Sequence, residues 1–527
     1  MKIIGKIIFF LSVFLAISLS IKGQPGSIDL SNYKPNYWIE NGPFELSPER
    51  GRFTLTYSII ENDSTIFDTS IAGFAAPDLG YKDGKFVSLF APGLSYILVP
   101  GYIFGKLIGY NQFGANLVVA LFALFNTCLV CSLTRRLGAK AMASFTAALV
   151  FIFATPAFSY AGSLYQHHIT TFILLSSFLI LLKERVNFID LAIVFLLISS
   201  GVLIDYPNAV ILFPLGVLAL SKIVKFKNKK NIFKFKIRPL MFISALSVIP
   251  VIMLFFAYNK VTYGNYLQLA GTVQSVAEVK NGKPFFEGSE KEDSFVEESP
   301  EEDKSALGFF ETRNLINGLY THTISPDRGI LIYAPVLLFS FIGGYMLFNK
   351  KDRYLWFFVL TVGLNVVLYS LWGDPWGGWA YGSRYLIPSY SLMAILVGIS
   401  LSKIRTNKTL RLFFMIFLVY SIFVNTLGAV TSNSNLPKIE AEELTFRSGK
   451  EQKYTYFRNI DLLNEDKSKA FIYNLAGPQS INAWGYFFIT LSIPTILIVF
   501  ILGQYFNYFN IDLSKKVINK NKINLKN

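Results

Sequence analysis

Residues 113–134 have the sequence FGANLVVALFALFNTCLVCSLT, which contains no charged side chain, and Arg135 and Arg136 follow directly. A transmembrane helix needs roughly 20 mostly apolar residues, so this run is long enough to cross a bilayer. Further apolar runs near that length lie at 3–21, 141–160, 168–182, 188–204, 207–221, 240–258, 330–348, 354–372, 385–402, 411–429 and 484–507. The sequence therefore predicts an all-α polytopic membrane protein with about 12 transmembrane helices.

The composition supports the same class. Of 527 residues, 52% are hydrophobic and only 16% are charged, whereas a soluble domain carries about 25% charged residues. The net charge of +15 suggests a nucleic-acid partner at first, but its distribution indicates membrane orientation, and no nucleic acid is expected. Cys128 and Cys131, the only cysteines, lie inside an apolar run and are interpreted as packing residues.

The distribution of charge predicts the orientation. Cytoplasmic loops of membrane proteins are rich in Lys and Arg. If residues 86–110 do not cross the bilayer, the loops at one end hold 27 of the 49 Lys and Arg but 4 of the 34 Asp and Glu. Both termini are then cytoplasmic. Counting 86–110 as a crossing would place Lys2 and Lys6 opposite every later basic loop. We therefore expect a multi-pass protein of the plasma (inner) membrane.

Residues 86–110 hold Pro92, Gly93, Pro100, Gly101 and Gly105, which would make a poor continuous helix. This stretch is predicted to be a re-entrant or juxtamembrane segment within the first outer loop.

The first apolar run has an alternative interpretation. Lys2 and Lys6 precede an apolar stretch that ends at Ser18-Leu19-Ser20, a pattern that also fits a cleaved signal peptide. Cleavage would leave the orientation of everything downstream unchanged.

Ionisable side chains are absent from the middle of every apolar run. Ion-coupled transporters need such groups inside the membrane, so this class is disfavoured. Polar residues gather instead at the predicted outer ends, with His167 and His168 in SLYQHH and Asp205-Tyr206 in a tight turn. These four are candidate substrate-binding residues.

One short outer loop, WGDPWGGWAYGSRYLIP at 372–388, concentrates aromatic residues, glycines and one arginine. An aromatic belt at the membrane interface would explain its Trp and Tyr residues. It would not explain Gly377, Gly378, Gly382 or Arg384, which suit a backbone that approaches a ligand. The candidate substrate-binding residues here are Trp376, Trp379, Tyr381 and Tyr385.

Two arginines are candidates for binding a donor phosphate, because the planar guanidinium grips phosphate well. Arg384 is the only Lys or Arg in a short outer loop, and Arg328, in SPDRG, directly precedes a membrane helix. Pairing with a nearby Asp or with a lipid headgroup is the alternative for both.

The first outer loop, 22–112, supplies carboxylates, of which Glu49, Asp68 and Asp78 are the catalytic candidates. Most carboxylates of such a loop are solvated surface groups, but one set in a cleft can act as a general base. No metal site is expected, although a divalent cation is not excluded.

Several segments, in this order, resemble the GT-C membrane glycosyltransferases, in particular the protein O-mannosyltransferase and aminoarabinose-transferase-like group. ERGRFTLTYSIIEND at 49–63 is similar to the group's acidic–x–x–Arg–aromatic stretch, and Asp68 and Asp78 follow it. KDGKFVSLFAPGLSYILVP at 82–100 is similar to the segment that leads into a juxtamembrane helix. SPDRG and WGGWAYGSRYLIP also resemble bacterial members. Members often have Asp-Glu where this chain has Glu49-Arg50, so only Glu49 matches the catalytic acid.

The resemblance implies transfer of a sugar from a polyprenyl phosphate to a glycan, lipid or protein acceptor at the non-cytoplasmic face, usually with inversion and without a cofactor. It implies a GT-C-like catalytic module over 1–429, with an outer loop at 259–329 whose acidic stretch 288–305 is expected to be flexible. Residues 430–527 would add an outer loop with a short helix or hairpin, the last membrane helix and a basic cytoplasmic tail. The alternatives are a polyprenyl-linked oligosaccharide polymerase or ligase, and a non-enzymatic lipid or polysaccharide transporter.

Overall fold

The computed structural model describes residues 3–32, 44–229, 232–286, 306–477 and 479–506. The acidic stretch 288–305 and the basic tail beyond residue 506, both singled out in the sequence, lie outside the described residues. The described chain is predominantly helical, and its strands are short.

The predicted membrane helices are present, and the all-α polytopic membrane fold is confirmed. Five helices are long and apolar enough to cross a bilayer; they are α6 (Asn111–Arg136), α12 to α13 (Met241–Tyr263), α18 with its preceding turn (Arg384–Thr406), α19 (Lys408–Val430) and α23 (Ala483–Tyr505). Seven shorter apolar helices accompany them; they are α1 (Ile3–Ser18), α7 (Ala141–Phe153), α8 (His167–Leu181), α9 (Phe188–Ile204), α11 (Phe213–Ile223), α16 (Ser340–Asn349) and α17 (Leu355–Ser370). These twelve correspond one to one with the predicted runs.

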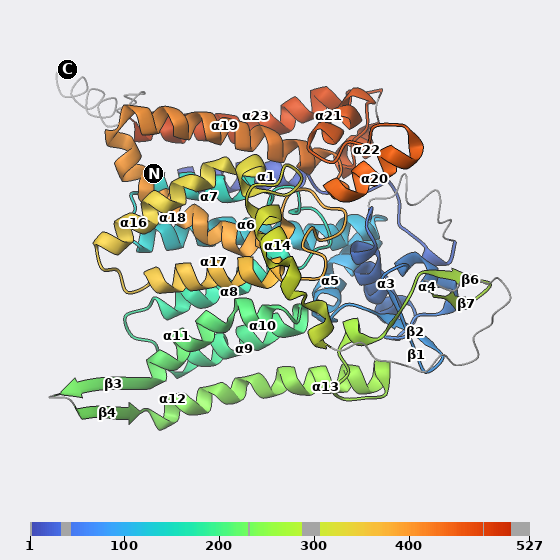
Figure 1. Ribbon diagram of the computed structural model, residues 1–527, viewed down its shortest axis with the longest axis horizontal. Coiled ribbons are helices and arrows are strands. Elements are labelled where there is room, and N and C mark those ends of the chain that lie inside the picture. Colours follow the sequence, from blue (N-terminus) through green and yellow to red (C-terminus); the bar gives the residue numbers. More distant parts are fainter. Residues whose placement is uncertain (1–2, 33–43, 230–231, 287–305, 478, 507–527) are drawn as a thin grey trace, which may run out of the picture.

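The bundle has two different ends, which Figure 1 shows at the left and the right. The N-terminus and the hairpin of β3 (Val224–Lys229) and β4 (Ile232–Ile237) lie at one end, here called the basic end. The other end, here called the loop-rich end, carries α3 (Ser47–Glu61), α4 (Thr69–Ala75) and α20 to α22. The predicted separation of basic loops from long loops is therefore present along the bundle axis.

At the loop-rich end, strand pairing joins segments that are far apart in sequence. β1 (Leu79–Lys82) pairs with β2 (Lys85–Ser88) through a two-residue turn at Asp83-Gly84, and both turn residues have positive φ, as tight hairpins require. β1 also pairs with β5 (Gln274–Val276) of the second loop.

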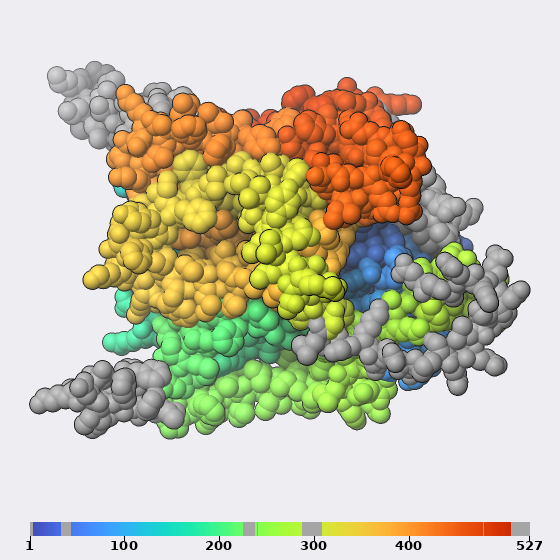
Figure 2. Space-filling model, in the orientation of Figure 1, coloured from blue at the N-terminus to red at the C-terminus, as the bar shows by residue number. Residues whose placement is uncertain are grey.

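The third long loop, for which the sequence left a short helix or a hairpin open, folds as short helices. They are α20 (Lys438–Ser448), α21 (Phe457–Asn464) and α22 (Phe471–Ala476). In Figure 2 the orange-red atoms of this loop lie against the blue atoms of the first loop.

Residues 86–110 form β2 and then α5 (Gly93–Leu107), which is continuous through Pro100. The expectation of a broken helix was wrong. Close glycine contacts between α5 and α6 support the continuous helix. A Cβ on Gly114 of α6 would lie 2.1 Å from the carbonyl oxygen of Gly101. With 15 residues, α5 is about 22 Å long, shorter than the bilayer core of roughly 30 Å, and it lies beside α3 at the loop-rich end (Figure 1).

The first apolar run packs into the bundle. Val13, Ala16 and Ile17 of α1 have no exposed surface, and α1 contacts α6 and α23. This packing favours the membrane-helix interpretation over the signal peptide.

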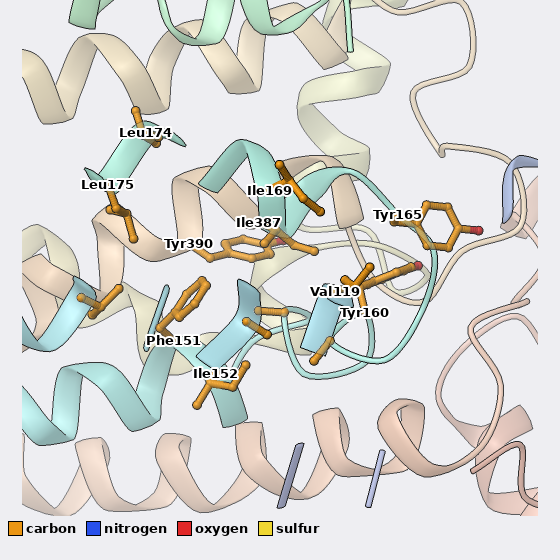
Figure 3. Packing of buried hydrophobic residues seen from close by; sticks show 14 of the residues in the cluster. Val119, Phe151, Ile152, Tyr160, Tyr165, Ile169, Leu174, Leu175, Ile387 and Tyr390 are labelled. Carbon is orange, nitrogen blue, oxygen red and sulfur yellow. The ribbon is translucent and has the colours of Figure 1, made fainter. Parts of the chain in front are cut away.

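The run 141–160 was predicted as one helix, but α7 ends at Phe153 and residues 154–166 form an irregular buried loop. Pro156 and Gly162 interrupt the helical pattern here. Figure 3 shows Tyr160 and Tyr165 of this loop with their hydroxyl groups directed away from the apolar packing around Phe151 and Ile152. This buried loop, residues 154–166, brings polar groups to the candidate site.

Candidate active site at the loop-rich end

Helix α3 carries the first part of the site. Pro48 in its first turn has no N–H to leave unpaired, and the negative charge of Glu49 suits a helix N-terminus. Glu49 is only 1% exposed and Arg52 only 5%. The intervening Arg50 has a structural role, because its guanidinium donates to the carbonyl oxygens of Phe74 and Ala76, each at 2.9 Å.

Glu49 is a buried carboxylate with a shifted pKa. Its Oε1 accepts a hydrogen bond of 3.3 Å from the backbone N–H of Leu164 in the buried loop. Burial raises the pKa of Glu49 from its ordinary 4.5 to about 7, against the opposing effect of the Lys22 charge. A carboxylate that titrates near neutral pH can both accept and release a proton under physiological conditions, which is the property that a general base needs.

Arg384 is the second part of the site. It begins the short 3₁₀ turn Arg384–Leu386 directly before α18 and is 7% exposed. Among the residues that the structure describes, its Nε and Nη1 make no hydrogen bond, although the Tyr385 hydroxyl interacts with the guanidinium. Its guanidinium lies over the ring of Tyr165 at 4.6 Å and over that of Tyr385 at 5.5 Å. A buried guanidinium with two unpaired nitrogens is costly unless a ligand supplies the acceptors.

Glycines in the preceding loop allow this close packing. Gly377, Gly378 and Gly382 all have positive φ, and a Cβ on Gly382 would lie 2.8 Å from Pro156 of the buried loop. The loop 372–388 therefore packs closely against the buried loop at Pro156. Arg384 Nε and Nη1 nevertheless remain without a hydrogen bond among the described residues.

Arg52 joins Arg384 at the same aromatic ring. Its guanidinium lies 4.4 Å from the ring centre of Phe90 and 5.7 Å from that of Tyr165. Tyr165 thus lies within reach of both arginines, and its own hydroxyl has no partner among the described residues. We name Arg52, Tyr165 and Arg384 the Tyr165 cluster.

Arg52 belongs to the acidic–x–x–Arg motif, but neither Arg52 nor Tyr165 was among the predicted site residues. The signal for Arg52 was present, because residues three apart lie on the same face of a helix. Tyr165 carried no comparable signal.

Neutral polar groups continue the lining next to the cluster. Gln166 donates through Nε2 to Asp205 Oδ2 at 2.9 Å, and its Oε1 has no partner. The ring of His167 lies parallel to that of Tyr165 at 6.0 Å and edge-on to Tyr385 at 5.9 Å, and its Nε2 is also unpaired. Burial raises the pKa of Asp205. The predicted residues His167, Asp205 and Tyr385 are therefore brought together.

Three other predicted residues form hydrogen bonds to backbone carbonyl oxygens of the protein. Arg328 donates to the carbonyl oxygens of Trp376, Asp327, Gly378 and Asn435 at 2.9–3.0 Å. His168 is bonded to the carbonyl oxygen of Ala157 at 2.9 Å. Tyr381 has no exposed surface and donates to the carbonyl oxygen of Val424.

The remaining predicted residues lie at the edge of the site or outside it. The indole N–H of Trp379 donates to Glu440 at 2.7 Å. Asp68 is exposed and accepts from Asn62. Asp78 accepts from Ser47 Oγ at 2.6 Å, beside the start of α3. Tyr206 packs edge-on against Phe255 of α13 at 6.2 Å. In the described ranges, no group of three or more His, Cys, Asp or Glu side chains is placed to hold a metal ion.

Comparisons with known proteins give a distant likeness in fold. No protein-family model and no curated protein sequence matches the chain. Two solved structures are similar. Both are of ArnT from Cupriavidus metallidurans: the apo form has 13% identity and a TM-score of 0.45 over 96% of this chain and 78% of that one. The form bound to undecaprenyl phosphate has 12% identity and a TM-score of 0.40 over 95% and 79%.

ArnT is an aminoarabinose transferase of the GT-C group, the group that the sequence motifs resemble.

Proposed function

We propose that this protein transfers a sugar from a polyprenyl-phosphate donor to an acceptor at the loop-rich end of its membrane bundle. The observation that carries the proposal is the buried Arg384 guanidinium, with two unpaired nitrogens, close enough to Glu49 for its charge to favour the ionised carboxylate. An anion-binding group and a proton acceptor in one buried site are what transfer from a phosphate leaving group requires.

The donor phosphate would bind at the Tyr165 cluster. Arg384 would donate from Nε and Nη1, which are buried and make no hydrogen bond within the described residues, and its planar guanidinium suits the oxygens of a phosphate. Arg52, whose guanidinium lies 5.7 Å from the ring centre of Tyr165, would add a second positive charge. The charged end of a lipid-linked donor would thereby be held at the end of the helices, while its isoprenoid chain stays in the bilayer.

Glu49 would act as the general base. As the acceptor hydroxyl oxygen forms a bond to the anomeric carbon, the hydroxyl proton passes to Glu49 and the bond from that carbon to the phosphate oxygen breaks. The bonding electrons leave with the polyprenyl phosphate, whose charge Arg384 and Arg52 stabilise. Attack from the side opposite the phosphate inverts the configuration of the sugar carbon.

The sugar would contact the neutral groups next to the cluster. Gln166 Oε1 and His167 Nε2 are both buried and unpaired among the described residues; a sugar hydroxyl can donate to Gln166 Oε1, and it can donate to or accept from His167 Nε2 according to the tautomer. The half-buried Asp205 would complete this set. The distribution of basic loops supports placing this end on the non-cytoplasmic side of the plasma membrane.

The test uses the purified full-length protein in nanodiscs. We expect it to bind undecaprenyl phosphate and, across a panel of polyprenyl-phosphate sugars, to release polyprenyl phosphate from at least one when acceptor is present. Lipid and product are followed by mass spectrometry. Binding followed by movement of the intact donor across the bilayer, with no cleavage of its sugar–phosphate bond, would favour the transporter instead. Release of an extended glycan chain would favour the polymerase or ligase.

A further inference from the structure

A second buried charge cluster lies directly beside Glu49 and has no part in the proposed chemistry so far. Lys22, just after α1, is 1% exposed, and its Nζ lies 3.5 Å from Oε2 of Glu45. Glu45 also accepts from the backbone N–H of Asn433 at 3.0 Å, and Lys469 Nζ lies 3.9 Å from its other oxygen. A buried ammonium with one long contact is an expensive feature to maintain in a protein interior.

Three consecutive residues of the buried loop connect this pair to Glu49. The carbonyl oxygen of Gly162 accepts from the backbone N–H of Lys22 at 3.1 Å. Ser163 Oγ accepts from the side chain of Asn433 at 3.0 Å, which in turn binds Glu45. Leu164 donates its N–H to Glu49 at 3.3 Å. One short stretch of backbone therefore fixes Lys22, Glu45 and Glu49 relative to one another.

The position of Lys22 is held from further directions. Asn116 of α6 donates to its carbonyl oxygen at 2.9 Å, and its backbone forms a β-bridge with Ala470. A Cβ on Gly162 would lie 2.5 Å from Cα of Ile21, so only glycine allows the loop to approach this closely. The backbone of Lys22 is thus fixed, and its buried side chain extends from there to Glu45.

We infer that Lys22 is a positioning residue of this site, which keeps the Glu49 carboxylate ionised and ready to accept a proton, while Glu45 limits that effect by pairing with Lys22. The inference rests on the proposed function, because it assigns Lys22 a role in the same step. Lys22 touches neither donor nor acceptor in this scheme and acts through Glu49 alone.

The charged and titratable groups around Glu49 come from every neighbouring element. They are Lys22 after α1, Glu45 before α3, Tyr160 and Tyr165 in the buried loop, and Arg384 before α18. After burial itself, the positive charge of Lys22 is the largest influence on the pKa of Glu49, and it lowers that pKa, whereas Glu45 raises it. Removing Lys22 and removing the charge of Glu45 should therefore shift Glu49 in opposite directions.

The experiment measures the ionisation of Glu49 directly, by infrared difference spectroscopy of its carboxyl stretch, with Glu49→Gln as the blank that identifies the band. We expect Lys22→Met to raise the titration midpoint by about one pH unit and Glu45→Gln to lower it by a similar amount. The double variant should return close to the original midpoint. Lys183→Met, which removes a lysine paired with Asp190 at the basic end, is the matched control and should leave the midpoint unchanged.

A purely structural role predicts a different result, since damage to packing would not move two variants in opposite directions. Equal midpoints in all variants, or shifts of the same sign, would overturn the inference. The pH dependence of sugar transfer is recorded alongside. Opposite infrared shifts without any transfer by the wild type would leave the Lys22–Glu49 coupling standing and refute the proposed function. Sugar transfer by the wild type with unchanged titration midpoints in the variants would leave the proposed function standing and refute the Lys22–Glu49 coupling.

Discussion

Arg328 and Arg384 are both almost completely buried at the loop-rich end, but their surroundings are opposite. The guanidinium of Arg328 is surrounded by four carbonyl oxygens, three of which belong to the 372–388 loop and the segment after α19. Arg384 has two nitrogens without acceptors and is in contact mainly with aromatic rings. Burial alone therefore does not identify a binding arginine; the number of protein acceptors does. Arg328 holds the loop in place, and that loop presents Arg384.

The largest expected effect concerns the proton acceptor that accompanies Arg384. Glu49→Gln keeps the shape of the side chain and removes the basic oxygen, so transfer should fall by about 10²–10⁴-fold. Donor binding should change little. The rate is measured as polyprenyl phosphate released per enzyme.

The stability of the Glu49→Gln variant serves as the control for folding. Because the pKa of Glu49 is raised in the folded protein, the stability associated with its protonated form is lost as the pH rises through about 7. Glu49→Gln should therefore be at least as stable as the wild type at pH 8. Unchanged transfer in Glu49→Gln would move the role of base to Asp78 or Asp68, and dispensability of all three would refute the transferase.

The contrast between Arg328 and Arg384 can be tested by measuring the stability of variants at each position. Arg328→Ala leaves several carbonyl oxygens unpaired in the interior, and we expect a loss of at least about 3 kcal/mol. Arg384→Ala removes a group with few protein partners and should be nearly neutral or stabilising. Thermal unfolding of both variants in the same detergent gives the contrast. If Arg384→Ala is the more damaging of the two, the assignment of roles is reversed.

Donor affinity should show the opposite ranking. Arg384→Ala should weaken binding of undecaprenyl phosphate by about 10–100-fold, since a hydrogen bond to a charged group contributes about 1.5–3 kcal/mol. Arg384→Lys keeps the charge but loses the planar fork, so it should fall between wild type and Ala. Equal binding by Ala and wild type would show that Arg384 contacts something other than the phosphate. Trp379→Phe, whose indole binds Glu440 outside the cluster, serves as the control with unchanged affinity.

The smallest expected effect is on pH dependence. In the proposed mechanism transfer requires ionised Glu49, and burial raises the pKa of this carboxyl to about 7, so the rate should rise by about tenfold from pH 6 to pH 8. A rate that is flat over this range, with binding also constant, would show that another group accepts the proton.

The fold was predictable because the bilayer imposes one length and one composition on each crossing. The run 113–134 could be assigned from its own residues, and so could the other eleven. The buried loop 154–166 could not, since Ala, Phe and Tyr suit a helix and a packed loop equally well, and Pro156 only suggested where the helix would end. What holds that loop is supplied by Asn433 and Lys22, which are remote in sequence.

The candidate site was predictable only in part. Glu49 stood out through its motif and Arg384 through its isolation among the outer loops, and the structure brings both to one place. Whether an arginine is free or fully bonded depends on carbonyl groups such as those of Gly378 and Asn435, whose positions follow from tertiary packing. Tyr165, which links Arg52 to Arg384, carries no charge or motif that would have marked it.

The β-bridge between Lys22 and Ala470 joins the exit of the first helix to the segment before the last one. During synthesis, Lys22, Glu45 and Glu49 emerge from the ribosome long before Asn433 and Ala470, the later residues that hold this region in place. The site is therefore assembled only when almost the whole chain has been inserted. A nascent chain that ends before residue 384 would carry Glu49 without Arg384, so the proposed transferase would stay inactive until biogenesis is nearly complete.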